Sequence, residues 1–98
     1  MSAPSITISS DALEPLRADL DGRLLRIAFT TGCGGSGYRL ASAAEPNEGD
    51  VVLEVESISI ALDELASSQL DGAVIVWDPQ EQGYGLEHPN AVTAVWCG

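Results

Sequence analysis

Short runs of alternating apolar and polar residues make up much of the chain, and such runs predict half-buried β-strands. Apolar residues recur at every second position in the following segments: Ile6–Ile8, Leu24–Thr30, Tyr38–Leu40, Val51–Val55, Ile58–Leu62 and Ala73–Trp77. A polar segment rich in turn-forming residues, Glu45–Asp50, interrupts this series. The pattern therefore predicts a fold built mostly from short strands.

One segment has helical spacing instead. Its apolar residues fall on one face of a helix: Leu13, Leu16 and Leu20. Ser9–Asp11 are residues that commonly begin helices, Glu14 completes a capping box with Asp11, and Asp21-Gly22 predicts the end. Because proline is well tolerated only in the first turn, Pro15 leaves the starting residue open. A shorter helical turn is expected over Asp63–Gln69, and the whole pattern indicates the α+β class with one main, N-terminal helix.

The pattern weakens after Trp77. The segments Asp78–Gly85 and His88–Asn90 are interpreted as turns. Residues 91–98 show no strong periodicity, and they are expected to form a flexible C-terminal tail. Since no repeat, linker or change of composition divides the chain, the sequence predicts a single domain over residues 1–98.

The charge of the chain excludes several functions. Fifteen acidic residues face four basic ones, all arginines, for a formal net charge of −11. The absence of lysine removes Schiff-base chemistry, and the acidic surface would repel nucleic acid and anionic lipid. Met1–Ser10 carry neither a basic start nor a long apolar run, so no signal peptide and no membrane span are expected, and the prediction is a cytoplasmic protein.

The candidate chemistry lies in two thiols, Cys33 and Cys97. Cys33 is surrounded by glycines, among them Gly32, Gly34 and Gly35, which permit unusual backbone angles and can turn N–H groups toward the sulfur. Such surroundings favour the thiolate. In a reducing compartment two cysteines are more often free, metal-bound or redox-active than joined permanently, although a structural Cys33–Cys97 disulfide and a frayed, inert Cys97 stay open.

Several separated motifs carry a resemblance to a known family. They are a Gly-Cys-x-Gly-x-x-Tyr loop at Gly32, Cys33, Gly35 and Tyr38, a Leu-x-Gly turn at Leu70–Gly72, and a turn at His88–Asn90 similar to Asn-Pro-Asn. In residues, order and spacing the chain resembles the HesB/IscA-type family of iron–sulfur carrier and scaffold proteins. The resemblance implies a HesB-like domain of β-sandwich type, and a carrier or scaffold in cluster assembly rather than an enzyme.

The chain departs from the family at its end. The family usually closes with Cys-Gly-Cys, whereas this chain has Val95-Trp96-Cys97. The resemblance therefore carries over only Cys33 and Cys97 as ligands of a cluster or of iron, with Gly32, Gly34 and Gly35 shaping the loop.

The number of cysteine ligands leads to a prediction about the oligomeric state. A [2Fe–2S] or [4Fe–4S] cluster commonly takes four cysteine thiolates, and this chain has two. A homodimer would complete the set, with Cys33 as the anchoring ligand and Cys97 as the exchangeable one. Assembly proteins and apo-protein recipients are the partners that the resemblance implies.

Two other functions stay open at this point. The loss of a cysteine at Val95 and the acidic charge favour a relative without a cluster that acts as a protein-interaction module. A thiol redox protein, in which Cys33 attacks and Cys97 resolves, would also use both cysteines. His88 is interpreted as a turn residue or an additional ligand, and Trp96 as an anchor of the tail or a shield for the site.

Overall fold

The computed structural model describes residues 4–32, 35–80, 83–89 and 94–96. In chain order the elements are β1 (Ile6–Ile8), α1 (Ser10–Leu20), β2 (Leu24–Gly32), β3 (Gly35–Ala43), β4 (Val51–Val55), β5 (Ile58–Leu62), α2 (Glu64–Gln69), β6 (Ala73–Asp78), β7 (Gly83–Glu87) and β8 (Ala94–Trp96). The expected α+β class is confirmed, and so are the six strands that alternation predicts, the N-terminal helix and the short second helix. Cys33, Gly34 and Cys97 lie outside the described residues.

The strands form two sheets. The smaller has the order β1-β6-β7, and the larger has the order β4-β5-β2-β3-β8. Hairpin neighbours pair antiparallel, whereas β1 with β6, β2 with β5, and β3 with β8 pair parallel. The parallel pairs join segments that are far apart in sequence, and the last of them brings the C-terminal strand to the edge beside β3.

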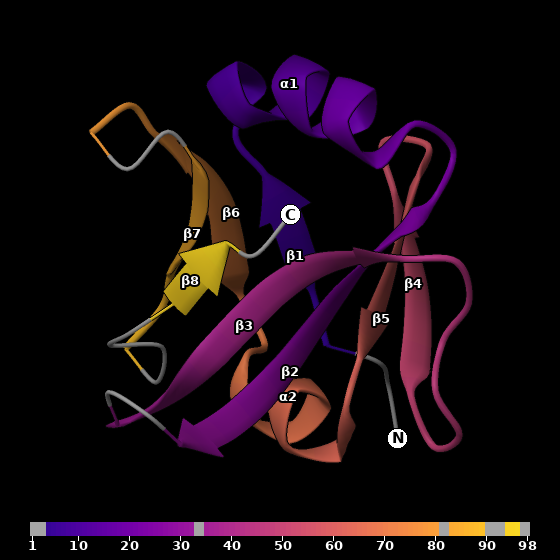
Figure 1. Cartoon of the computed structure of the whole chain (residues 1–98), viewed down its shortest axis with the longest axis vertical. Coiled ribbons are helices and arrows are strands. Elements are labelled where there is room, and N and C mark those ends of the chain that lie inside the picture. The colour runs from indigo at the N-terminus through magenta and orange to yellow at the C-terminus, as the bar shows by residue number, and fades with distance from the viewer. Residues whose placement is uncertain (1–3, 33–34, 81–82, 90–93, 97–98) are drawn as a thin grey trace.

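The two sheets pack around one core, which is closed by the helices. In Figure 1, α1 lies across one end of the molecule and α2 lies at the opposite end. Buried side chains come from both sheets and from both helices; they include Leu16, Ile27, Leu40, Leu70 and Ile75. This arrangement confirms the expected β-sandwich type with added helices.

Helix α1 follows the expected amphipathic pattern, with two differences at its start. Leu16 and Leu20 are buried as expected, but Ala12 rather than Leu13 completes the fully buried stripe. The helix begins after Ser9, whose hydroxyl donates to Asp11 Oδ1 at 2.7 Å instead of accepting from the helix backbone. The predicted capping box is therefore absent, and the helix ends at Asp21, which takes a left-handed conformation with φ of 47°.

Two strands after Trp77 were not expected: β7 includes part of a segment interpreted as a turn, and β8 lies in the segment expected to be a flexible tail. Gly83–Glu87 form β7, which pairs antiparallel with β6, although its two glycines lower its strand propensity. Ala94–Trp96 form β8, within the tail that lacks periodicity. Ala94, Val95 and Trp96 are all apolar and so show no alternation, and pairing with β3 decides the conformation. Whether residues 91–98 as a whole are flexible stays a prediction.

No helix in the described part of the chain is both long enough and apolar enough to span a bilayer.

Candidate functional site

The β2–β3 hairpin positions the loop that contains Cys33. Its strands pair continuously from Leu24 opposite Ala43 to Gly32 opposite Gly35. Residues 33–34, which include Cys33 and Gly34, connect the last pair and lie outside the described residues. The glycines expected to shape the loop thus include Gly32 and Gly35, which form the closing pair of a long ladder.

Two features fix this hairpin to the rest of the fold. Asp63 accepts a hydrogen bond from Phe29 N at 3.0 Å and a second from Ala66 N at 2.7 Å, so one carboxylate caps α2 and holds β2. The rings of Phe29 and Tyr38, opposite each other in the ladder, meet edge to face at 5.4 Å. Tyr38 is 4% exposed, and burial together with the negative charge of Asp63 raises its pKa. Tyr38 thus has a packing role.

The second thiol follows a much shorter element. Strand β8 pairs with β3 at only three positions, the last being Trp96 beside Leu40. Both strands run in the same direction, so β8 leads away from the end of β3 that begins at Gly35. Cys97, the residue after Trp96, lies outside the described residues.

Trp96 packs into an aromatic cluster formed by Trp77, Tyr84 and Trp96, one ring from each of β6, β7 and β8. The centroids of Tyr84 and Trp96 lie 4.8 Å apart and those of Trp77 and Tyr84 lie 5.2 Å apart, both edge to face. Gly83 lies directly under Trp96, since a Cβ added there would meet Cβ and Cδ1 of Trp96 at 3.1 Å. Trp96 is therefore held by specific side-chain contacts, which favours the anchor interpretation.

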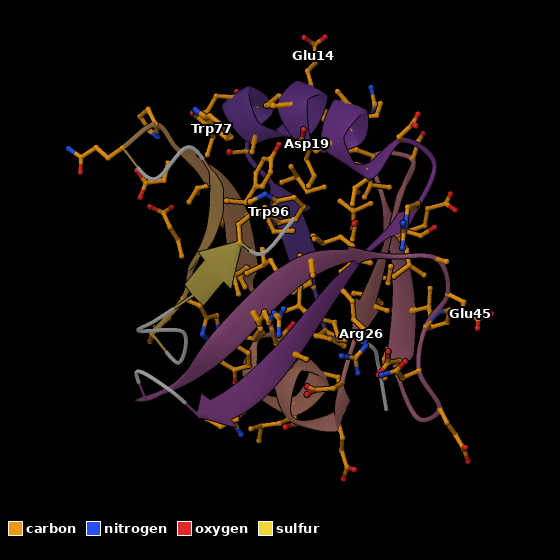
Figure 2. All side chains as sticks on the ribbon, viewed as in Figure 1. Glu14, Asp19, Arg26, Glu45, Trp77 and Trp96 are labelled. Carbon is orange, nitrogen blue, oxygen red and sulfur yellow. The ribbon has the colours of Figure 1, made fainter. Side chains whose placement is uncertain are left out.

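Helix α1 contacts this cluster through Asp19. The Tyr84 hydroxyl donates to Asp19 Oδ2 at 2.6 Å, and Figure 2 shows Asp19, Trp77 and Trp96 in the same region beneath α1. Burial, followed by the hydrogen bond to Asp19 and its negative charge, raises the pKa of Tyr84 strongly. The ring of Tyr84, 3% exposed, is thus fixed at both its face and its hydroxyl.

His88 makes a contact that explains its place in a turn. Its Nε2 lies 2.7 Å from the carbonyl oxygen of Asp71. Because a carbonyl only accepts, Nε2 is the donor in this bond. Asp71 in turn accepts from Ser5 N at 2.7 Å, so His88 joins the turn before β6 to the start of the chain. The contact supports the turn interpretation of His88 rather than a ligand role.

Several acidic residues have specific structural partners. Asp50 accepts from Arg26 Nε at 2.9 Å and from Nη2 at 3.1 Å. This pair lowers the pKa of Asp50 and raises that of Arg26. Among the described residues, no group of three or more His, Cys, Asp or Glu side chains is arranged to hold a metal ion.

Sequence reasoning missed Gly83, Tyr84 and Asp19. Tyr84 and Leu86 do alternate with glycines, a signal that could have predicted β7, but the glycines favoured a turn. Nothing in the sequence indicates that Asp19 lies under Tyr84, because the two are brought together only by the packing of α1 on the smaller sheet.

Strand β2 leads into the glycine-rich segment that contains Cys33, and β8 precedes Cys97 in the sequence. A small β-sandwich with cysteines at these two places in the sequence defines a class of proteins. Residues 4–98 match the family described as "Iron-sulphur cluster biosynthesis". The chain belongs to this family, which confirms the resemblance found from the sequence motifs.

Individual relatives agree with this assignment. The iron-sulfur cluster insertion protein ErpA 2 of Methylococcus capsulatus is 30% identical over 106 residues, covering 100% of this chain and 82% of the relative. A protein of Bradyrhizobium diazoefficiens without a described function is 32% identical over 69 residues, 68% of this chain and 65% of its own length. The chain thus spans just under two thirds of that second relative.

Solved structures share the architecture. Escherichia coli SufA, involved in biosynthesis of iron-sulfur clusters, superposes with a TM-score of 0.72 at 20% identity, covering 93% of this chain and 92% of SufA. IscA with a [2Fe-2S] cluster superposes with a TM-score of 0.66 at 25% identity, covering 93% of this chain and 91% of IscA. The fold of this chain is therefore that of the IscA-like proteins.

Proposed function

We propose that this protein is a cytoplasmic carrier or scaffold in iron–sulfur cluster assembly, and that it binds a cluster, or iron, through Cys33 and Cys97. It would act without catalysing a reaction of its own, as a homodimer, receiving its cargo from assembly proteins and passing it to apo-protein recipients. Membership of the iron–sulfur cluster biosynthesis family is the observation that carries the proposal. The cluster in IscA and the insertion role in the name of ErpA 2 support it.

The register of the larger sheet supports a site shared between two chains. Gly32 lies opposite Gly35, and Trp96 lies beside Leu40, so about 17 Å of strand β3 separate the two levels. Gly32 and Trp96, the described neighbours of Cys33 and Cys97 in the sequence, therefore lie at different levels of the larger sheet.

The different levels of Gly32 and Trp96 bear on the alternatives. They favour a site shared between chains over a disulfide or a redox cycle that joins the two cysteines of one molecule. Two chains related by a two-fold axis could bring Cys33 of one close to Cys97 of the other, which also completes a set of four thiolates. The thiol count and the register therefore favour the same dimeric arrangement.

Anaerobic reconstitution tests the proposal. Wild-type protein incubated with iron and sulfide should develop the broad visible absorption of a protein-bound cluster, with about one cluster per two chains by iron analysis and light scattering. Cys33→Ala should abolish the absorption, and Cys97→Ala should reduce it less if an external thiol fills the open position. Ser36, near the start of β3, provides the matched control, because Ser36→Ala removes no thiolate.

The outcomes separate the candidate functions. Wild-type protein that binds no more iron than Cys33→Ala would overturn the carrier proposal. Colourless protein that still forms a specific complex with assembly proteins would point to the interaction module, which the valine at Val95 favours. A loaded monomer would contradict the shared site.

A further inference from the structure

The few basic residues of this acidic chain are distributed unevenly over its surface. Arg17 and Arg23, two of the four arginines, line one hollow with a volume of about 370 Å³. None of the acidic residues in the described part of the chain belongs to its lining, although Asp21 and Glu56 adjoin it in the sequence. On a protein with a formal net charge of −11, the hollow is therefore a locally basic site.

The hollow lies between the C-terminal end of α1 and the turn that joins β4 to β5. These two parts of the chain lie side by side in Figure 1, and Arg17 in the last turn of α1 connects them by donating from Nη2 to the carbonyl oxygen of Glu56 at 2.8 Å. Leu24, the first residue of β2, also lines the hollow. The hollow is thus at the other end of the β2–β3 hairpin from Gly32 and Gly35.

The two guanidinium groups have donors left for a ligand. The bond to Glu56 orients Arg17 and uses one of its five N–H groups. The side chain of Arg23 is exposed and, among the residues that the structure describes, has neither an ion-pair partner nor a hydrogen-bond acceptor. Since a guanidinium binds carboxylate or phosphate oxygens through parallel N–H bonds, this pair suits a molecule with two anionic groups.

The turn that lines the hollow contains a serine at a strained position. Glu56 and Ser57 take φ of 52° and 67°, in the left-handed region, between the end of β4 and the start of β5. Two-residue hairpin turns prefer glycine or asparagine at such positions, because other side chains are strained there. Ser57 belongs to the lining of the hollow, so a hydrogen bond from its hydroxyl to a ligand gives a reason for serine at this position.

We propose that the hollow binds a small organic anion with two negative charges, a dicarboxylate or an organic phosphate, through Arg17 and Arg23. Ser57 adds a hydroxyl donor, and the buried Leu24 and Ile58 provide an apolar wall for the carbon skeleton. The volume lies in the lower part of the range of small-molecule sites. A small molecule is favoured over an acidic protein segment, because the net charge of the chain repels a large polyanion.

Isothermal titration calorimetry of the metal-free protein tests the proposal. Succinate or glycerol 3-phosphate should bind saturably, and the tighter of the two identifies the anionic group that the hollow prefers. Succinamide has the skeleton of succinate without its charges, and it should not bind. Inorganic phosphate should bind about tenfold more weakly than the tighter organic anion, because it lacks a skeleton to contact the apolar wall.

Three variants assign the binding to the hollow. Arg23→Gln should weaken binding of the tighter probe about tenfold, because it removes charge-assisted hydrogen bonds. Ser57→Gly should weaken it about threefold without destabilising the fold, since glycine readily takes a φ of 67°. Arg39→Gln is the matched control: this exposed arginine of β3 is not part of the lining, its loss changes the net charge equally, and the affinity should change by less than about twofold.

Equal weakening by Arg23→Gln and Arg39→Gln would show a response to overall charge and would overturn the proposal. So would binding of succinamide, or the absence of saturable binding by both organic anions. Inorganic phosphate that binds as tightly as the organic probes would reduce the hollow to a site for an adventitious ion only, and binding of a polyglutamate peptide alone would assign it to an acidic protein segment. No iron is present in these titrations, so their outcome is independent of the proposed carrier function.

Discussion

The two segments that bear the thiols are held in opposite ways. The β2–β3 hairpin has an unbroken ladder from Leu24 to Gly32, buried side chains along its length and a carboxylate that ties it to α2. Strand β8 has three paired residues and one large side chain. The first element is held by many small contributions, whereas the second is held by a three-residue ladder and by the packing of Trp96 on Gly83 and Tyr84. The proposed division into an anchoring Cys33 and an exchangeable Cys97 assigns the anchoring ligand to the more extensively held element.

The largest expected effect comes from Leu40, a residue of β3 that pairs with β8. Leu40 is fully buried in β3 and lies beside Trp96 in the ladder. Leu40→Ala should lower the free energy of unfolding by about 3 kcal/mol, because it leaves a cavity in the core. Urea denaturation followed by circular dichroism measures this change.

Leu40→Ala also tests the comparison itself. If β3 and β8 belong to one cooperative unit, alkylation of Cys33 and of Cys97 should accelerate together. Val52→Ala provides the control, since this side chain is 51% exposed on β4 and contributes little to the core. A loss below 1 kcal/mol for Leu40→Ala would contradict the central place given to β3.

The second prediction concerns the hairpin alone. Asp63 accepts from Phe29 N and Ala66 N, so Asp63→Ala leaves two backbone donors without their partner. The expected loss is about 2 kcal/mol, combining an N-cap with a partly buried hydrogen bond. Glu64→Ala, on the exposed neighbouring residue, should change stability by no more than about 0.5 kcal/mol.

Chemical denaturation of the Asp63→Ala and Glu64→Ala pair settles whether the hairpin depends on α2. Equal stability of the two variants would show that the carboxylate is not needed to hold β2. The rate of Cys97 alkylation should stay at the wild-type value in both variants under native conditions, because neither residue contacts the aromatic cluster.

The sequence predicted the hairpin much better than the tail, for a physical reason. Long strands such as β2 repeat the apolar alternation often enough to be recognised, and burial of every second residue follows from it. Strand β8 consists of three apolar residues without alternation, and the glycines of β7 favour a turn over the strand that its alternation indicates. The conformation of β7 depends on pairing with β6, and that of β8 depends on pairing with β3 and on the packing of Trp96, contacts that form only in the folded chain.

The same reasoning applies to the candidate site. The thiols, the glycine-rich loop and the family could be inferred from Cys33 and its neighbours, because chemistry of this kind depends on residue identity. The structural roles of Asp63 and Asp19 could not be inferred from the sequence. Acidic residues are common in this chain, and only their positions in the fold distinguish these two from the others. Tertiary contacts, rather than composition, select which carboxylates are structural.

The third prediction compares the two tyrosines, one in the hairpin and one under the tail. Burial raises the pKa of both Tyr38 and Tyr84 above the ordinary value of 10.0, more strongly for Tyr84. Above pH 10.0 the unfolded chain loses these protons while the folded chain keeps them, so unfolding becomes more favourable as pH rises. Stability should therefore be complete below pH 10.0 and should fall by about 1 kcal/mol per pH unit for each such group above it.

Urea denaturation between pH 9 and about pH 12, with tyrosinate absorbance recorded alongside, measures this slope. Tyr84→Phe should remove more of the slope than Tyr38→Phe, since the Tyr84 hydroxyl also faces the carboxylate of Asp19. Tyrosinate that forms near pH 10.0 in the folded protein would contradict the burial of both hydroxyls.

The smallest effect is expected at the end of the hairpin far from Gly32. Arg26 of β2 donates two hydrogen bonds to Asp50, whose side chain is 2% exposed and whose pKa is lowered by the pair. Asp50→Asn should lower the free energy of unfolding by about 1 kcal/mol at neutral pH, since a partly screened ion pair is lost while the side-chain shape is kept.

The effect of this substitution should depend on pH. Because the folded pKa of Asp50 is depressed, its contribution to the stability of wild type is present above the ordinary value of 3.8 and is lost as pH falls through the folded value. The stabilities of wild type and Asp50→Asn should thus converge as pH falls below 3.8 in urea denaturation. A difference in stability that stays constant as pH falls would show that the ionised state of Asp50 does not contribute.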